Sequence, residues 1–116
     1  MKIHETRTIT SEVEGGSEKT LLVHVRTNFD ENIHMISLEV KGEPNLLRVN
    51  WRHPFRVHRK MVDHIESIIN ENPWILERLW FEATEPTRAR LNARAFKLKG
   101  YQVYYEFGNY YSIRKP

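Results

Sequence analysis

Cationic side chains gather near the middle of the chain, where a predicted strand gives way to a predicted helix. The N-terminus of a helix carries unpaired N–H groups and the positive end of the helix dipole, so it binds anions well. Cations placed there are unfavourable by roughly 0.3–1 kcal/mol each, and their accumulation indicates an anion nearby, such as a phosphate. The alternative is that these long side chains extend into solvent at little cost. The residues concerned are Arg52, His53, Arg56, His58, Arg59 and Lys60.

A second cationic group follows later in the chain and precedes a run of aromatic residues. Basic residues beside aromatic residues can bind single-stranded nucleic acid through phosphate contacts and base stacking. Tyrosines that alternate along a hairpin more often pack on the sheet, so nucleic acid is the less favoured partner. The cations are Arg88, Arg90, Arg94, Lys97 and Lys99, and the tyrosines are Tyr101, Tyr104, Tyr105, Tyr110 and Tyr111.

Several other chemistries lack their signatures. The chain has no cysteine, which excludes disulfides, thiol nucleophiles and cysteine-bound zinc. Its six histidines form no His-Glu-x-x-His motif. His24 and His34 could face each other across a predicted hairpin, but two imidazoles make an incomplete metal site. The nucleophile-elbow, phosphate-loop and dinucleotide-binding glycine motifs are also missing. We therefore predict no metal site.

Length and composition predict one folded domain spanning residues 1–116. Hydrophobic residues make up 40% and charged residues 28% of the chain, which argues against wholesale disorder. No apolar run is long enough to span a bilayer, and the first ten residues lack the apolar stretch of a signal peptide. With no cysteine in the chain, these features lead us to expect a cytoplasmic protein without a membrane partner.

Charge is distributed unevenly along the chain. Residues 1–48 carry six basic and eight acidic side chains, a net charge of −2, whereas residues 49–116 carry twelve basic and seven acidic side chains, a net charge of +5. The second half is the candidate surface for an anionic partner, namely a phosphate, a nucleotide, a nucleic acid or an acidic protein. The alternative is an ordinary solvated surface.

The first half of the chain predicts an antiparallel meander. Apolar residues alternate with polar ones, which is the period of a half-buried strand. Glycine, asparagine and proline between these stretches predict turns. We expect strands at 2–10, 20–27, 33–41 and 46–51, separated by a loop at 12–19 and turns at 28–32 and 42–45.

The second half begins with a change to helical spacing. Pro54 suits a first helical turn, and an apolar stripe follows until Pro73 ends the helix. We then expect a strand at 75–83, a helix from Pro86 to about Lys99 closed by Gly100, and a hairpin of strands at 101–107 and 110–114. The predicted fold class is α+β (mixed α/β), a meander followed by α-β-α-β-β with two main helices.

Two stretches carry a resemblance to a known family. The predicted second helix ends in Phe96, three further residues, and then Gly100-Tyr101. Residues 49–51 belong to the strand predicted before the first helix, and residues 55–61 lie at the predicted start of that helix. In these features, and in the order of its elements from residue 46 onward, the chain resembles the GNAT acyltransferase superfamily. The resemblance implies a GNAT-like fold and an acetyl-CoA-dependent N-acyltransferase.

The resemblance also implies roles for individual residues. Asn50, Trp51 and Arg52 would lie along the pantetheine arm of acetyl-CoA or CoA, and a second group would lie near its phosphates. Glu82, at the end of the next strand, would be the general base, and Tyr101, Tyr104 or a water molecule would supply the proton of the general acid. The residues expected near the phosphates are Arg56, His58, Arg59 and Lys60.

The chain departs from the family pattern in three places. It has no glycine between Gly42 and Gly100, although the family's loop uses glycines to close backbone amides on the pyrophosphate. Phe96 stands where many members have a tyrosine acid. About ten loop residues, 11–20, replace two helices that shape the acceptor site. These departures favour an alternative, a non-catalytic GNAT-fold binding or structural protein, virus-encoded or accessory, with a protein partner.

Overall fold

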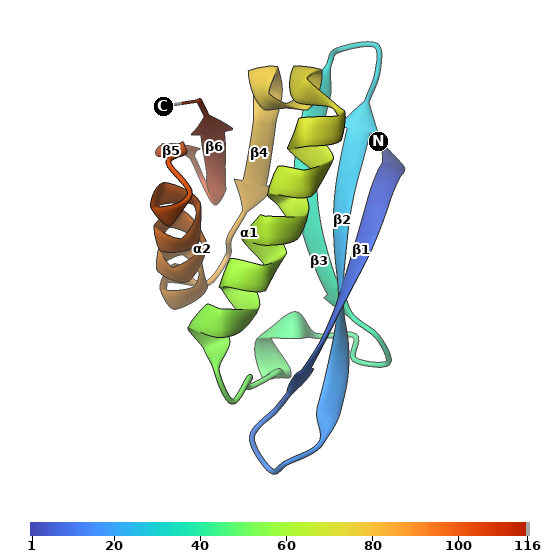
Figure 1. Cartoon of the computed structure of the whole chain (residues 1–116), viewed down its shortest axis with the longest axis vertical. Coiled ribbons are helices and arrows are strands. Elements are labelled where there is room, and N and C mark those ends of the chain that lie inside the picture. Colours follow the sequence, from blue (N-terminus) through green and yellow to red (C-terminus); the bar gives the residue numbers. More distant parts are fainter. Residues whose placement is uncertain (116) are drawn as a thin grey trace.

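The chain folds around a six-stranded sheet with two α-helices packed on one face (Figure 1). The computed structural model describes residues 1–115, apart from the side chain of Leu47. Neighbouring strands are antiparallel except β3 and β4, which are parallel. The predicted α+β class with two main helices is confirmed. The strands are β1 (Lys2–Glu12), β2 (Glu18–Asn28), β3 (Ile33–Val40), β4 (Leu79–Glu82), β5 (Gln102–Phe107) and β6 (Tyr110–Arg114), in the spatial order β1-β2-β3-β4-β6-β5.

Period-two alternation in the meander places one set of side chains against the helices. Val23 lies opposite Leu38 and Val25 opposite Ile36, with no slip in register between β2 and β3. Both valines are fully buried. Because successive side chains of a strand point to opposite faces, the residues between them lie on the other face, which neither helix covers (Figure 1).

The first long helix, α1 (Pro54–Glu71), confirms the prediction made from its apolar stripe. Six side chains form the apolar stripe of α1, and burial of each one contributes roughly 1.5–3 kcal/mol to folding through the hydrophobic effect. The helix ends where the N–H of Asn72 donates to the carbonyls of Ile68 and Ile69, directly before Pro73. The apolar stripe that lies against the sheet consists of Val57, Met61, Val62, Ile65, Ile68 and Ile69.

The second helix, α2 (Pro86–Leu98), is defined at both ends by local chemistry. The side chain of Glu85 accepts hydrogen bonds from the backbone N–H groups of Thr87 and Arg88, which satisfies two of the donors that a helix start leaves unpaired. At the other end Gly100 adopts a φ of +92°, a left-handed conformation that glycine reaches without a steric penalty. The α2 helix therefore begins and ends as predicted.

The predicted strand at 46–51 is wrong. Leu46–Arg48 forms a short 3-10 helix, η1, and only Trp51 makes a strand-like contact, an isolated bridge to Val13. The guanidinium of Arg88, on α2, donates to the carbonyls of Leu46 and Val49 at 2.7 and 2.8 Å. Arg88, about forty residues away in sequence, thus binds carbonyls that would otherwise pair with a neighbouring strand. The alternation of apolar and polar residues over 46–51 does not reveal this contact.

The predicted strand at 75–83 is right only at its end. Pro73–Arg78 forms a second 3-10 helix, η2, and β4 begins at Leu79. Ile75 and Leu76 are both buried, so this short apolar run faces the core on consecutive residues. Periodicity alone does not separate a buried strand from a buried helical turn over so few residues.

Neither α1 nor α2, nor any other helix within residues 1–115, combines the length and the hydropathy that crossing a bilayer requires.

Candidate functional site

The two parallel strands at the centre of the sheet separate after a short contact. β3 and β4 pair at three positions, the last being Ile36 opposite Phe81. The N–H of Lys41 donates to the carbonyl of Thr20 at 2.9 Å, so the odd-numbered residues of β3 direct their backbone groups toward β2. Leu38, two residues beyond the last pair, directs its N–H and C=O toward the gap. No backbone hydrogen bond joins Leu38 to β4 among residues 1–115.

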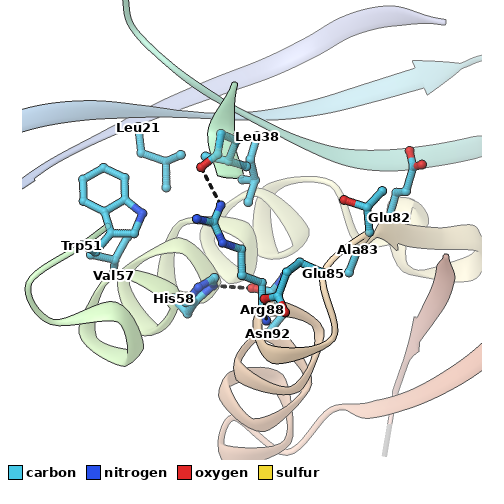
Figure 2. A pocket seen from close by; sticks show the side chains of 12 residues that line it. Leu21, Leu38, Trp51, Val57, His58, Glu82, Ala83, Glu85, Arg88 and Asn92 are labelled. Carbon is cyan, nitrogen blue, oxygen red and sulfur yellow. Dashed lines mark hydrogen bonds between the residues drawn. The ribbon is translucent and has the colours of Figure 1, made fainter. Parts of the chain in front are cut away.

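A cavity of about 70 Å³ lies beside this free edge, between the sheet and the N-terminal turns of both helices (Figure 2). Two larger hollows adjoin it. One of about 270 Å³ shares Leu38 and Glu82 with it, and one of about 420 Å³ shares His58 and Arg88 with it. The apolar lining of the central cavity is Leu21, Leu38, Leu46, Trp51, Val57 and Ala83, and the polar lining is His58, Glu82, Thr84, Glu85, Arg88 and Asn92.

Arg88 projects from α2 toward the loop before α1 and forms part of the cavity wall (Figure 2). It forms no ion pair among the described residues, because its two hydrogen bonds go to carbonyls of the 46–49 segment. Burial lowers the pKa of the Arg88 guanidinium, and the nearby Glu85 carboxylate acts in the opposite direction. Hydrogen bonds from the N–H groups of Thr87 and Arg88 lower the pKa of Glu85. The cavity thus has a fixed cation in its wall.

His58 and Asn92 form a buried polar pair between the two helices. Nδ1 of His58 and Oδ1 of Asn92 share a hydrogen bond, and both residues are buried. Burial lowers the pKa of His58, the hydrogen bond to Oδ1 of Asn92 acts against this, and the Arg88 cation acts with it. His58 is therefore neutral near pH 7 and lies in the walls of both the central cavity and the larger hollow beside it.

The residues expected along a pantetheine arm occupy different environments. Trp51 is buried and lines the cavity, and Asn50 is exposed beside the adjoining hollow. Arg52 is exposed and forms an ion pair with Glu12 at 3.2 Å. Residues 49–51 do not form the expected strand, so the free strand edge in this structure belongs to Leu38 on β3.

The residues expected near phosphates separate into two groups. Arg56, Arg59 and Lys60 are exposed on the first turns of α1, and none of them lines the cavity or the two hollows that adjoin it. The first turn of α1 has no acidic residue. His58, by contrast, faces inward and is bonded to Asn92. The structure therefore brings His58 into the cavity and leaves the three cations on the surface.

Of the three predicted catalytic residues, only Glu82 lines the cavity. The hydroxyl of Tyr101 donates to Glu66 at 3.3 Å, and burial, followed by the charge of Glu66, raises the pKa of Tyr101 to about 12. Tyr104 is exposed on β5, where its hydroxyl donates to Gln102. Neither tyrosine lines the central cavity or its neighbouring hollows.

The cations of α2 do not form one continuous basic face. Lys99 forms ion pairs with Asp63 and Glu66 of α1. The Arg88 guanidinium donates hydrogen bonds to the carbonyls of Leu46 and Val49 in the cavity wall. Arg90, Arg94 and Lys97 remain, beside a shallow groove that Ala93 and Leu98 complete. Binding of nucleic acid, the less favoured partner in the sequence analysis, stays a prediction. Only these three cations of α2 would be available to contact its phosphates.

The histidines of the first hairpin do not face each other. In the β2–β3 register Ser37 lies opposite His24 and Thr27 opposite His34, which places the imidazoles on opposite faces of the sheet. His24 bonds with Thr6 and Glu39, and His34 bonds with Thr27 and Asn32. Within residues 1–115 no group of three or more histidine, aspartate or glutamate residues could hold a metal ion.

Sequence analysis did not identify Asn92 or Glu85 as parts of a site, and it placed Arg88 among the cations of a candidate nucleic-acid surface instead of a cavity wall. Asn92 falls three residues after Ala89 and four before Phe96, so a polar residue occupies the packing stripe of α2. That interruption is the signal from which a buried partner could have been inferred. The role of Arg88 has no such signal, because its partners are backbone carbonyls about forty residues earlier.

We expect the stability of the protein to fall between pH 7 and pH 5. Burial lowers the pKa of both His34 and His58 below the unfolded value of 6.5. Below pH 6.5 the unfolded chain therefore binds protons that the folded chain does not, and each histidine costs up to about 1.4 kcal/mol per pH unit. Urea denaturation across this range measures the loss. His34→Gln should flatten the pH dependence, whereas the same change at the exposed His53 should not.

Comparison with protein-family models, with curated proteins and with solved structures finds no match to this chain.

Proposed function

We propose that the protein binds acetyl-CoA or CoA and transfers the acyl group to an amine, as the resemblance to the GNAT superfamily implies. The observation that carries the proposal is the divergence of β3 and β4, which leaves the N–H and C=O of Leu38 free beside a cavity. The pantetheine arm of CoA contains amide groups. A chain of amides can bind a free strand edge in the way that a peptide adds to a sheet.

The order of elements supports the same proposal. A meander leads through α1 to β4, α2 and a terminal hairpin, which is the order expected from the family. The free strand edge beside the cavity belongs to β3 rather than to residues 49–51. The pantetheine arm is therefore assigned to β3, with Trp51 as the opposite wall of the cavity.

The exposed cations of α1 support a place for the phosphates outside the cavity. Arg56, Arg59 and Lys60 form no ion pair among the described residues, although they share a helix with several acidic residues. The missing glycines leave fewer free amides for a diphosphate, so these side chains would supply more of the attraction. CoA affinity should accordingly weaken as ionic strength rises.

In this proposal the N–H of Leu38 polarises the thioester carbonyl as negative charge develops on its oxygen. The amine nitrogen attacks that carbonyl, and Glu82 at the edge of the cavity is the predicted acceptor of the amine proton. The apolar lining excludes water, which strengthens these interactions and limits hydrolysis of the thioester.

A non-catalytic CoA-binding protein is the second candidate, and one observation favours it. Phe96, at the position of the family's tyrosine acid, is fully buried and has no proton to donate. Tyr101 uses its hydroxyl on Glu66, outside the cavity. CoA binding without acyl transfer to any amine would distinguish this candidate from the enzyme.

Calorimetric titration with CoA and acetyl-CoA tests the proposal. Ligand at 100 times its dissociation constant should stabilise the folded protein by about 2.7 kcal/mol, which a melting curve also detects. Ala83 lines the cavity and is half-buried, so Ala83→Phe fills the space and should weaken binding at least tenfold. Ala93→Phe is the matched control, because Ala93 lies on α2 beside the shallow groove and away from the cavity.

Two outcomes would count against the proposal. One is the absence of heat and of any thermal shift with the unsubstituted protein at millimolar CoA. The other is equal CoA affinity in the Ala83→Phe and Ala93→Phe variants, which would place the ligand elsewhere.

A further inference from the structure

One ring nitrogen of His58, in the wall of the cavity, is left without a hydrogen-bond partner among the described residues. Its Nδ1 is bonded to Oδ1 of Asn92, and its Nε2 has no hydrogen-bond partner within residues 1–115. Nε2 is not fully enclosed, and the His58 side chain lines both the central cavity and the hollow beside it. A buried imidazole with one nitrogen held and the other open is arranged to exchange a proton.

The bond to Asn92 decides which nitrogen carries the proton. An amide oxygen only accepts hydrogen bonds, so Nδ1 of His58 is the donor and carries the hydrogen. Nε2 is then the ring nitrogen that carries the lone pair. Burial lowers the pKa of His58, which favours the neutral ring and its free lone pair at neutral pH.

We propose that His58, held in this tautomer by Asn92, is the proton acceptor of the cavity. This inference rests on the proposed acyl transfer and deepens it, because it moves the proton acceptor from Glu82 to His58. The amine nitrogen forms a bond to the thioester carbon, and Nε2 takes the proton that the nitrogen loses. The carbon–sulfur bond then breaks, and the leaving thiolate receives that proton from the imidazolium to give CoA. Asn92 acts as a positioning residue.

Charged groups around His58 favour a neutral imidazole at rest and tolerate an imidazolium during reaction. Arg88, on the facing helix, lowers the pKa of His58. Carboxylates from three other segments share the cavity or the hollow beside it, and each would favour the protonated ring once a proton is transferred. They are Glu82 at the end of β4, Glu85 before α2 and Glu14 in the β1–β2 turn.

A purely structural role for the pair would tie α1 to α2 and nothing more. The distinguishing measurement is the pH dependence of acyl transfer. Asn92→Asp keeps an accepting oxygen and adds a negative charge, so it should raise the pKa of His58 and move the acid limb of kcat/KM to higher pH. A structural contact alone would leave that limb where it was.

His58→Gln completes the test. It should lower kcat by 100-fold to 10,000-fold, the usual range for loss of a general base, while the calorimetric Kd for CoA stays within twofold. His64→Gln is the matched control, since His64 lies on the same helix and outside the cavity. Glu82→Gln, assayed alongside, should retain more activity than His58→Gln.

Three results would overturn the inference. The first is acyl transfer by the His58→Gln variant with the same rate and pH dependence as the unsubstituted protein. A weaker Kd with unchanged kcat would instead assign His58 to cofactor binding. Nitrogen-15 NMR of the imidazole showing the proton on Nε2 would remove the basis of the tautomer.

If the proposed function itself is wrong, the unsubstituted protein does not bind CoA. Calorimetry detects this result without any assay of acyl transfer, so it is distinguishable from a wrong assignment of His58. Nitrogen-15 NMR of the imidazole still shows, in that case, whether Nε2 is the unprotonated nitrogen and can act as a base.

Discussion

Replacing Phe96 with alanine is expected to lower the free energy of unfolding by about 3–5 kcal/mol. Phe96 is fully buried and stacks on Phe81 with ring centroids 6.0 Å apart, while Tyr101 meets its edge at 6.1 Å. The ring therefore joins α2 to the sheet and to the chain that enters β5. Truncation removes this burial and leaves a void that the surrounding strands cannot close. Urea denaturation monitored by circular dichroism measures the change.

Leu98→Ala is the control for this prediction. Leu98 is on the same helix with 61% of its surface exposed, so its truncation should change stability by less than about 0.5 kcal/mol. Equal losses in the two variants would show that Phe96 is not the packing centre of α2. For a domain whose total stability is about 5–15 kcal/mol, the Phe96 loss alone could unfold much of the population.

Replacing Trp51 with alanine is expected to be about as damaging, by roughly 3–5 kcal/mol. Only 7% of Trp51 is exposed, its backbone bridges to Val13, and its ring forms a wall shared by the cavity and the adjoining hollow. Removal of the ring should merge these two spaces and release the 49–53 segment from the end of β1. The loss is measured by denaturation, with binding of a hydrophobic dye as a second readout of the opened wall.

A second tryptophan provides the comparison. Trp74 is 38% exposed and packs against His4, His34 and Phe29 at the other end of the sheet. Trp74→Ala should cost clearly less and should leave dye binding unchanged. If Trp74→Ala were the more destabilising variant, the packing role given to Trp51 would be wrong.

These two residues connect the stability of the fold to the proposed site. Phe96 fixes the helix that carries Asn92, Arg88 and the capping Glu85. Trp51 fixes the segment whose carbonyls Arg88 binds. The cavity is therefore a product of packing between distant segments, and variants at its edge, such as Ala83→Phe, are better probes of binding than variants in its walls.

Local chemistry in the sequence was sufficient for most of the elements. The stripe from Val57 to Ile69 predicted α1, because helical spacing over several turns matches no other structure. Proline at each helix start and Gly100 after α2 placed the helix ends, since these residues restrict the backbone directly. Alternation predicted β2 and β3 in the same way.

Tertiary contacts decided what the sequence left open. Residues 46–51 alternate like a strand, yet Arg88 binds their carbonyls from α2 and holds them in another conformation. The sequence groups His58 with the candidate anion-binding side chains of the first helix, but in the structure it is buried and bonded to Asn92 on the facing helix. The position of the free strand edge, at Leu38, depends on where β3 and β4 separate.

What the sequence determined by itself was therefore the type, order and ends of α1 and α2 and the pairing of β2 with β3, since each depends on neighbours within a few residues. What only the tertiary structure decided was which side chains share the cavity. That outcome depends on contacts between residues 34 to 42 positions apart, such as His58 with Asn92 and Leu46 with Arg88. No periodicity within one element records such contacts, because the partners come together only when the helices pack on the sheet.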